Sequence, residues 1–140
     1  MHTEIPFPIH PQLANASIPV CELPLCSVLL MDNQRFPWLL LIPRREGVQE
    51  IIDLHEKEQP LLWREIHAAS HLLRNLFSPD KLNVATIGNL VPQLHVHVIA
   101  RFKTDDAWPK PVFGFAPPIP YTPEQRANLV ERIRDGLQTS

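Results

Sequence analysis

The stretch that decides the fold is Val91-Pro92-Gln93-Leu94-His95-Val96-His97-Val98-Ile99-Ala100-Arg101. It is an apolar, valine-rich run typical of a β-strand, in which successive side chains point to opposite faces. We therefore expect Gln93, His95 and His97 on one face and the apolar residues between them on the other. Neighbours on one face lie about 6.5–7 Å apart along the strand. Two imidazoles at this spacing suit one small anionic group or one metal ion.

The two histidines leave three interpretations open. A neutral imidazole is a nucleophile near neutral pH and can carry a phosphoryl or nucleotidyl group, provided that the attacking nitrogen is bare and the other nitrogen holds the proton. A main-chain carbonyl can hold that proton. The same pair could instead be the solvated face of a structural strand. It could also supply two ligands of a metal site, which usually needs a third ligand.

Composition limits the class of protein and its partners. A chain of 140 residues with 44% apolar and 20% charged residues fits one domain with one core. Its net charge of −2 gives no general electrostatic case for binding nucleic acid or an anionic membrane. No apolar run reaches the roughly 18–20 residues of a membrane helix, and residues 1–11 lack a signal-peptide pattern. The expected location is the cytoplasm.

The cysteines and prolines give weaker signals. Cys21 and Cys26 do not have the two-residue gap common in zinc knuckles, and Cys26 begins an apolar run. We expect reduced, structural thiols, with a metal role or a disulfide as the alternatives. The chain has 16 prolines, many of them near the start and between residues 109 and 123. These segments are predicted to be extended and ordered by packing.

Periodicity predicts an α+β fold, an antiparallel sheet of about five strands with helices packed on one face. The predicted strands are 18–23 (an edge strand), 26–31, 38–42, 82–87 and 94–101, and the main helices are 61–77 and the segment from 122 onward, with short helical turns near 11–16 and 47–54. Residues 32–37 have turn chemistry, which predicts an antiparallel hairpin of the second and third strands. Thr122 and Gln125 predict a capping box.

The run from Gln93 to Arg101 resembles the motif of the histidine triad (HIT) family of nucleotide hydrolases and transferases. That motif alternates three histidines with apolar residues, and here Gln93 replaces the first histidine. The resemblance extends beyond the motif, because the family has the same types of element in the same order as residues 28–32, 38–45, the long helix and 82–89. It covers about residues 18–102. It implies a single HIT-like domain over 1–140, with a Pro-rich segment and a C-terminal helix over 103–140.

The resemblance implies a role for each matching residue. His95 would attack the α-phosphorus of a nucleotide and form a nucleotidyl-histidine that water resolves, with no metal and no cofactor required. The main-chain carbonyl of Gln93 would hold the proton of His95, and His97 would contact the phosphate. Asp32 occupies the place of the family's ribose-binding residue, and its carboxylate can accept two hydroxyl hydrogen bonds, which fits that role. The alternative for Asp32 is an ordinary turn residue.

The chain also departs from the family pattern. Gln93 removes one imidazole, and Leu90 stands where the family usually has a Ser or Thr that helps the leaving group. Asn89 is the best remaining candidate for a phosphate or ribose contact, with a turn role as the alternative. Leu30 is a candidate for lining a base pocket, with core packing as the alternative. Arg101 is a candidate for facing a phosphate, with a surface salt bridge as the alternative.

These departures leave two functions to separate. The resemblance implies a nucleotide hydrolase or nucleotidyl transferase whose partner is a small-molecule nucleotide. The alternative is a nucleotide-binding protein with little or no turnover. Family members pair by joining their sheets, so the resemblance also implies a homodimer.

Overall fold

An antiparallel sheet organises the chain in the computed structural model, which describes residues 6–138. Over these residues the strand order is β1-β2-β3-β5-β4. The strands are β1 (Ser17–Glu22), β2 (Cys26–Met31), β3 (Trp38–Pro43), β4 (Lys81–Ala85) and β5 (Val96–Arg101), and the helices are α1 (Pro11–Ala14), the 3-10 turn η1 (Ile51–Asp53), α2 (Gln59–Phe77) and α3 (Pro123–Gln138). The predicted α+β fold is confirmed. β4 ends two residues earlier than expected, and β5 begins at Val96 rather than Leu94.

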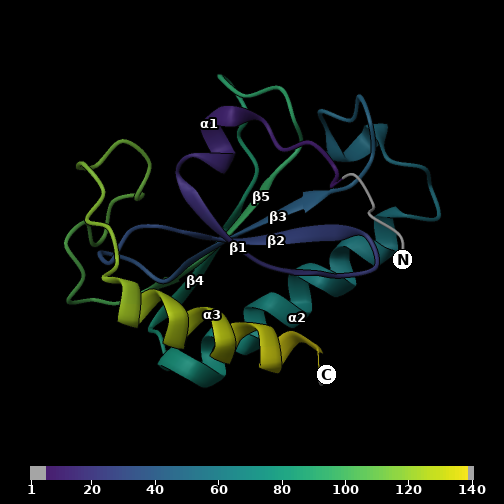
Figure 1. The fold of residues 1–140 in the computed structure, drawn as a ribbon. Helices are drawn as coiled ribbons and strands as arrows, with labels where there is room; N and C mark the ends of the chain where they lie inside the picture. Colours follow the sequence, from purple (N-terminus) through teal and green to yellow (C-terminus); the bar gives the residue numbers. More distant parts are fainter. Residues whose placement is uncertain (1–5, 139–140) are drawn as a thin grey trace.

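Helices α2 and α3 lie together under one face of the sheet, as Figure 1 shows. The core on this side includes Val28, Leu30, Leu39, Val98 and Ile133. The opposite face is covered by the short helix α1 and by the Pro-rich segment 102–121. On that face, Leu13 of α1 belongs to a buried cluster with Leu40, and Val112 of the Pro-rich segment belongs to one with Trp38. Cover on both faces explains why every residue of β3 is buried, as its unbroken apolar run predicted.

A buried carboxylate joins α2 to the start of β2. The side chain of Glu65 on α2 is 4% exposed and accepts the backbone N–H groups of Leu25 and Cys26, each at 2.8 Å. Both donors would otherwise be buried without an acceptor, which is costly. Glu65 therefore fixes the position of the helix along the sheet. Cys21 and Cys26 are free thiols, and burial followed by the nearby Glu65 raises the pKa of the Cys26 thiol.

The turn between β2 and β3 holds the Pro-rich segment against the sheet. Gln34 donates its backbone N–H to the carbonyl of Ile119 at 2.7 Å and its side-chain Nε2 to that of Pro120 at 2.7 Å. The predicted capping box at the start of α3 is confirmed, because Thr122 and Gln125 exchange side-chain to backbone hydrogen bonds. These contacts order a segment that has no regular structure of its own.

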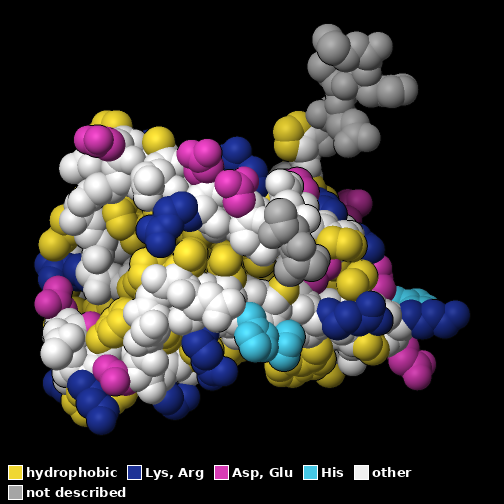
Figure 2. Space-filling view, turned by 90° about the horizontal axis from the view of Figure 1, so that it is seen from below, with side chains coloured by type: hydrophobic (Ala, Val, Ile, Leu, Met, Phe, Trp, Pro, Cys, Tyr) yellow, Lys and Arg dark blue, Asp and Glu magenta, His cyan; other side chains and the backbone are white. Residues whose placement is uncertain are grey.

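The surface of the helix layer carries charges of both signs. Figure 2 shows Lys and Arg side chains scattered among Asp and Glu on this face, with no continuous positive area. This face therefore lacks the continuous positive surface that would bind a polyanion. In the part of the chain that is described, no helix combines the length and the apolar character needed to cross a membrane.

Glu65→Gln tests the link between α2 and β2. The amide offers one acceptor oxygen for two N–H donors, so one buried N–H loses its partner. The free energy of unfolding, measured by urea denaturation, should fall by about 1–3 kcal/mol. Glu131→Gln makes the same chemical change at an exposed position of α3 and should stay within about 0.5 kcal/mol of the wild type. Equal stability of the two variants would refute the role of Glu65.

Candidate functional site

A cavity of about 360 Å³ lies beside the two histidines of the motif. Its lining residues are His95 and His97, the run Ile87–Val91 and Phe113, so it has no Lys, Arg, Asp or Glu side chain among them. Gly88 adopts φ +64° there, and an added Cβ would lie 3.2 Å from the carbonyl oxygen of Val91. This position therefore needs glycine. The turn that results places Asn89 and Leu90 at the cavity.

One hydrogen bond defines the proton position on His95. Its side chain is 5% exposed, and its Nδ1 lies 2.7 Å from the main-chain oxygen of Gln93. A carbonyl oxygen only accepts hydrogen bonds, so Nδ1 must carry the proton. Nε2 of the neutral ring is therefore bare. The contact with the Gln93 carbonyl is the one that the family resemblance implied.

His97 has the opposite proton arrangement. The indole Nε1 of Trp38, which can only donate, lies 3.0 Å from Nδ1 of His97. Nδ1 is therefore the acceptor, and Nε2 carries the hydrogen. Burial, with a further contribution from His95, lowers the pKa of His97 to about 4, so its ring is neutral at pH 7. The two imidazole centroids lie 5.0 Å apart, and the pair offers one bare nitrogen and one N–H.

Two aromatic residues that sequence reasoning missed surround His97. The ring of Phe113 meets the imidazole edge to face at 4.8 Å and meets Trp38 at 5.7 Å. Trp38 was recognised only as a strand residue, and Phe113 lies in the irregular Pro-rich segment. Local sequence patterns carry no signal for either contact, because both join segments far apart in the chain.

The side chain of Gln93 serves a different purpose from its carbonyl. Its Oε1 accepts the backbone N–H of His10 at 2.8 Å, and its Nε2 donates to the carbonyl of Pro8 at 2.9 Å. Gln93 thus holds the segment that leads into α1. A second cavity of about 590 Å³ lies beside it, lined by residues from 7–10, 45–49 and 92–93.

Comparison with known proteins agrees with this arrangement. The family model for the HIT domain matches residues 12–104. The chain belongs to the histidine triad family. A histidine triad protein from Marinobacter aquaeolei VT8 is 44% identical, with 95% of this chain and 97% of that chain covered and a TM-score of 0.92. One from Bradyrhizobium japonicum is 43% identical, with 94% and 98% covered and a TM-score of 0.91. Comparison with curated proteins gives no match.

Three residues that the family resemblance suggested for nucleotide binding do not line the cavity. Leu30 pairs with Leu39 across the sheet, and it packs with the helix layer on the opposite face from His97. Asp32 accepts the backbone N–H of Tyr121 at 2.9 Å and lies 3.7 Å from Arg126. It therefore holds the entry to α3. The third residue, Arg101, is buried and forms a salt bridge with Asp105 in the segment that follows β5.

The guanidinium of Arg101 makes four hydrogen bonds within the domain. Its side chain is 2% exposed and pairs with Asp105 at 2.8 Å, and it also donates to Asn83 Oδ1 and the Lys110 carbonyl, each at 2.8 Å. Burial raises the pKa of Asp105, but hydrogen bonds from Arg101 and from the N–H of Phe102 outweigh burial and bring it below its ordinary value of 3.8. Arg101 therefore orders the start of the Pro-rich segment, in a buried salt bridge rather than a surface one.

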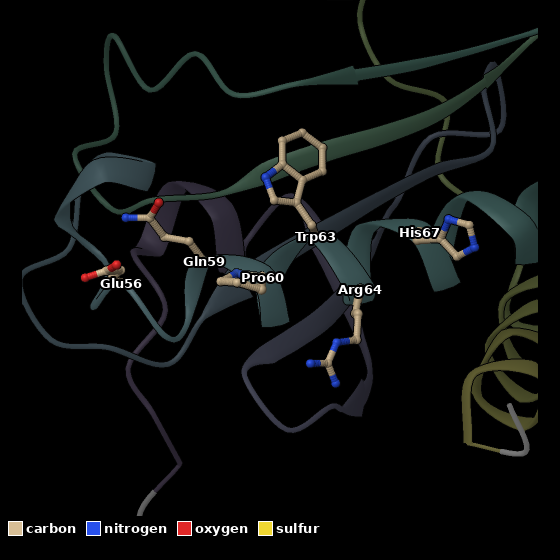
Figure 3. A pocket seen from close by; sticks show the side chains of 6 residues that line it. All are labelled: Glu56, Gln59, Pro60, Trp63, Arg64 and His67. Atoms are coloured by element: carbon tan, nitrogen blue, oxygen red, sulfur yellow. The ribbon is translucent and has the colours of Figure 1, made fainter.

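The described residues also show whether the chain gathers the ligands of a metal site. Over residues 6–138, no three His, Cys, Asp or Glu side chains gather as ligands of one ion. A larger hollow of about 710 Å³ lies on the outer side of α2. Figure 3 shows its six side chains, among them Trp63 and His67, spreading in different directions from the helix instead of converging. It lacks the converging polar groups of a ligand site.

Arg101→Lys tests the buried salt bridge between Arg101 and Asp105. A lysine keeps the charge but cannot reproduce the planar fork of donors, so the free energy of unfolding at pH 7 should fall by about 2–3 kcal/mol. Because Asp105 has a lowered pKa when folded, its contribution is present above pH 3.8 and is lost as acid protonates it. The difference between wild type and variant should therefore shrink in acid. Arg126→Lys, at a side chain 45% exposed, is the control and should change stability little. A stable Arg101→Lys protein would contradict the assignment.

Proposed function

We propose that this histidine triad protein is a nucleotide hydrolase or nucleotidyl transferase that works through a covalent nucleotidyl-histidine at His95. The observation that carries the proposal is the paired proton arrangement of two buried imidazoles beside one cavity. His95 has a bare Nε2 because Gln93 O holds its Nδ1–H at 2.7 Å. His97 has an Nε2–H because Trp38 occupies its Nδ1. Attack on phosphorus needs the bare Nε2 of His95, and a hydrogen bond to a phosphate oxygen needs the Nε2–H of His97.

The reaction follows from these roles. The lone pair of His95 Nε2 forms a bond to the α-phosphorus, and the bond from phosphorus to the leaving group breaks. The Nδ1–H of the now cationic ring stays bonded to the Gln93 carbonyl. Water then attacks phosphorus and breaks the bond to Nε2. Over the whole cycle, water supplies a hydroxyl to phosphorus and a proton to the leaving group.

The lining of the cavity suggests how a nucleotide is held. With no charged side chain in the lining, a phosphate oxygen would receive neutral hydrogen bonds, from His97 and from the amide of Asn89. The apolar side chains of Ile87, Leu90 and Phe113 would contact the nucleoside or the leaving group. Leu30, Asp32 and Arg101 lie outside the lining and take no part in this assignment.

A nucleotide-binding protein with little turnover is the second candidate function. Both polar atoms of the Gln93 side chain are occupied by the segment before α1, so that side chain does not serve the leaving group. Leu90 supplies no hydroxyl, and it is 86% exposed. A protein of this kind would bind the nucleotide without forming the covalent intermediate.

A nucleoside phosphoramidate separates the two functions. After incubation and acid-free quenching, mass spectrometry should find a nucleoside monophosphate adduct on the peptide that contains His95. The adduct should be absent in His95→Ala and still form, more slowly, in His97→Ala, because only the first variant removes the nucleophile. His71→Ala, an exposed histidine on α2, is the control and should match the wild type. Nucleotide binding without adduct or product would support the second function.

We also propose that the chain forms a homodimer through the edge of the sheet at β4. The edge at β1 is partly covered by α3, since Arg134 donates to the Val20 carbonyl at 3.2 Å. The edge at β4 lies at the other end of the strand order, and Val84 on it is 44% exposed. An uncovered edge strand with an exposed apolar side chain favours pairing with another strand.

Val84→Lys tests this contact. The wild type should show twice the mass of one chain by light scattering after gel filtration, and Val84→Lys should shift it toward the monomer, because it buries a charge in the joined edge. Ile52→Lys makes the same kind of change at an 83% exposed residue of η1 and should leave the mass unchanged. A wild-type monomer, or a dimer that tolerates Val84→Lys, would refute the placement.

A further inference from the structure

Trp38 is in contact with the proposed site from a neighbouring strand. It opens β3, where its Cα pairs with Ile99, while Leu40 pairs with His97. The indole therefore reaches His97 diagonally across the ladder. Its side chain is buried at 7% exposure among Phe36, Ile99 and Val112. The indole N–H has its acceptor in His97 Nδ1 at 3.0 Å.

We infer that Trp38 is a positioning residue that holds His97 as the Nε2–H tautomer and thereby makes it a hydrogen-bond donor toward the cavity. This inference deepens the proposed function and rests on it for its catalytic meaning. The tautomer itself follows from geometry alone. A proton on Nδ1 would face the indole N–H and leave a buried donor without an acceptor, which is unfavourable.

The comparison with His95 shows why such a device is needed. Both histidines line the same cavity, and the centroids of their rings are 5.0 Å apart. Without partners, each neutral ring could adopt either tautomer. If both rings were Nδ1–H tautomers, the bare Nε2 of His97 would repel a phosphate oxygen instead of donating to it. A backbone carbonyl fixes His95 and an indole N–H fixes His97, so the two identical side chains acquire complementary roles.

The environment of His97 supports a neutral donor. Phe113 packs edge to face on the ring at 4.8 Å, and Trp38 and Phe113 together shield it. The low pKa of His97, about 4 and caused first by burial, means that the ring donates as neutral imidazole at pH 7. Protonation would add a second N–H at Nδ1 and break the contact with Trp38.

Nitrogen NMR of histidine-labelled protein at pH 7 tests the inference directly, because long-range correlations distinguish the two tautomers. His95 is expected as Nδ1–H and His97 as Nε2–H, with each signal assigned by its loss in His95→Ala or His97→Asn. In Trp38→Phe, which keeps an aromatic ring but removes the N–H, His97 should populate the Nδ1–H form while His95 stays unchanged. Trp63→Phe is the matched control at an exposed tryptophan of α2 and should change neither histidine.

The effect of Trp38 on turnover can be measured separately from its effect on the tautomer of His97. If phosphoramidate turnover is observed, Trp38→Phe should lower kcat about 10-fold, the effect of one hydrogen bond, with a smaller change in KM. A wild-type His97 in the Nδ1–H form, or a tautomer unaffected in Trp38→Phe, would overturn the inference even if His95 chemistry is confirmed. Conversely, failure of the His95 adduct would leave the tautomer result standing and remove only its catalytic meaning.

A further measurement covers the case in which Trp38→Phe does not fold. The indole N–H of Trp38 should be protected from hydrogen exchange in the wild type. Protection should persist in His97→Asn, whose Oδ1 can replace Nδ1 as an acceptor, and fall in His97→Leu, which offers none. Equal protection in the Asn and Leu variants would also overturn the inference.

Discussion

The site depends on the hydrogen bond between the main-chain oxygen of Gln93 and Nδ1 of His95, 2.7 Å long. Because the acceptor is a backbone atom, its chemistry does not depend on the side chain at position 93. Replacing the first histidine of the family motif by glutamine therefore keeps the proton of His95 where nucleophilic attack requires it. It also frees the side chain of Gln93 for the segment before α1, where it bonds to both Pro8 and His10.

The strand that carries His97, with His95 directly before it, is covered on both faces and paired along both edges. β5 lies between β3 and β4 and is buried along its whole length, with helix α2 on one face and the Pro-rich segment on the other. At its far end, Arg101 and Asp105 tie that segment to the sheet. This packing holds His97, and His95 directly before the strand, in position without a ligand, which is the support that a preorganised site requires.

Much of the fold could be predicted because its signals are local. Period-two alternation placed His95 and His97 on one face, the apolar run 38–42 indicated a strand covered on both sides, and Thr122 with Gln125 marked the start of α3. The contact from the Gln93 carbonyl to His95 was implied by the family resemblance, which matches Gln93 to the first motif position, although both residues precede β5 in the structure. The ends of β4 and β5 were less predictable, because strand ends depend on which partner residues pair.

Register between segments distant in the chain decides the surroundings of Leu30 and Trp38, whereas distance along one strand decides those of Arg101. Leu30 looks equivalent to Leu29 in sequence, yet its pairing with Leu39 turns it toward the helices. Arg101 shares the face of His97, but it lies four positions further along the strand, about 13 Å away, and it pairs with Asp105 instead of lining the cavity. Trp38 is the converse case. This residue at the start of a strand contacts the candidate site because β3 and β5 are neighbours, and its indole N–H then donates to Nδ1 of His97.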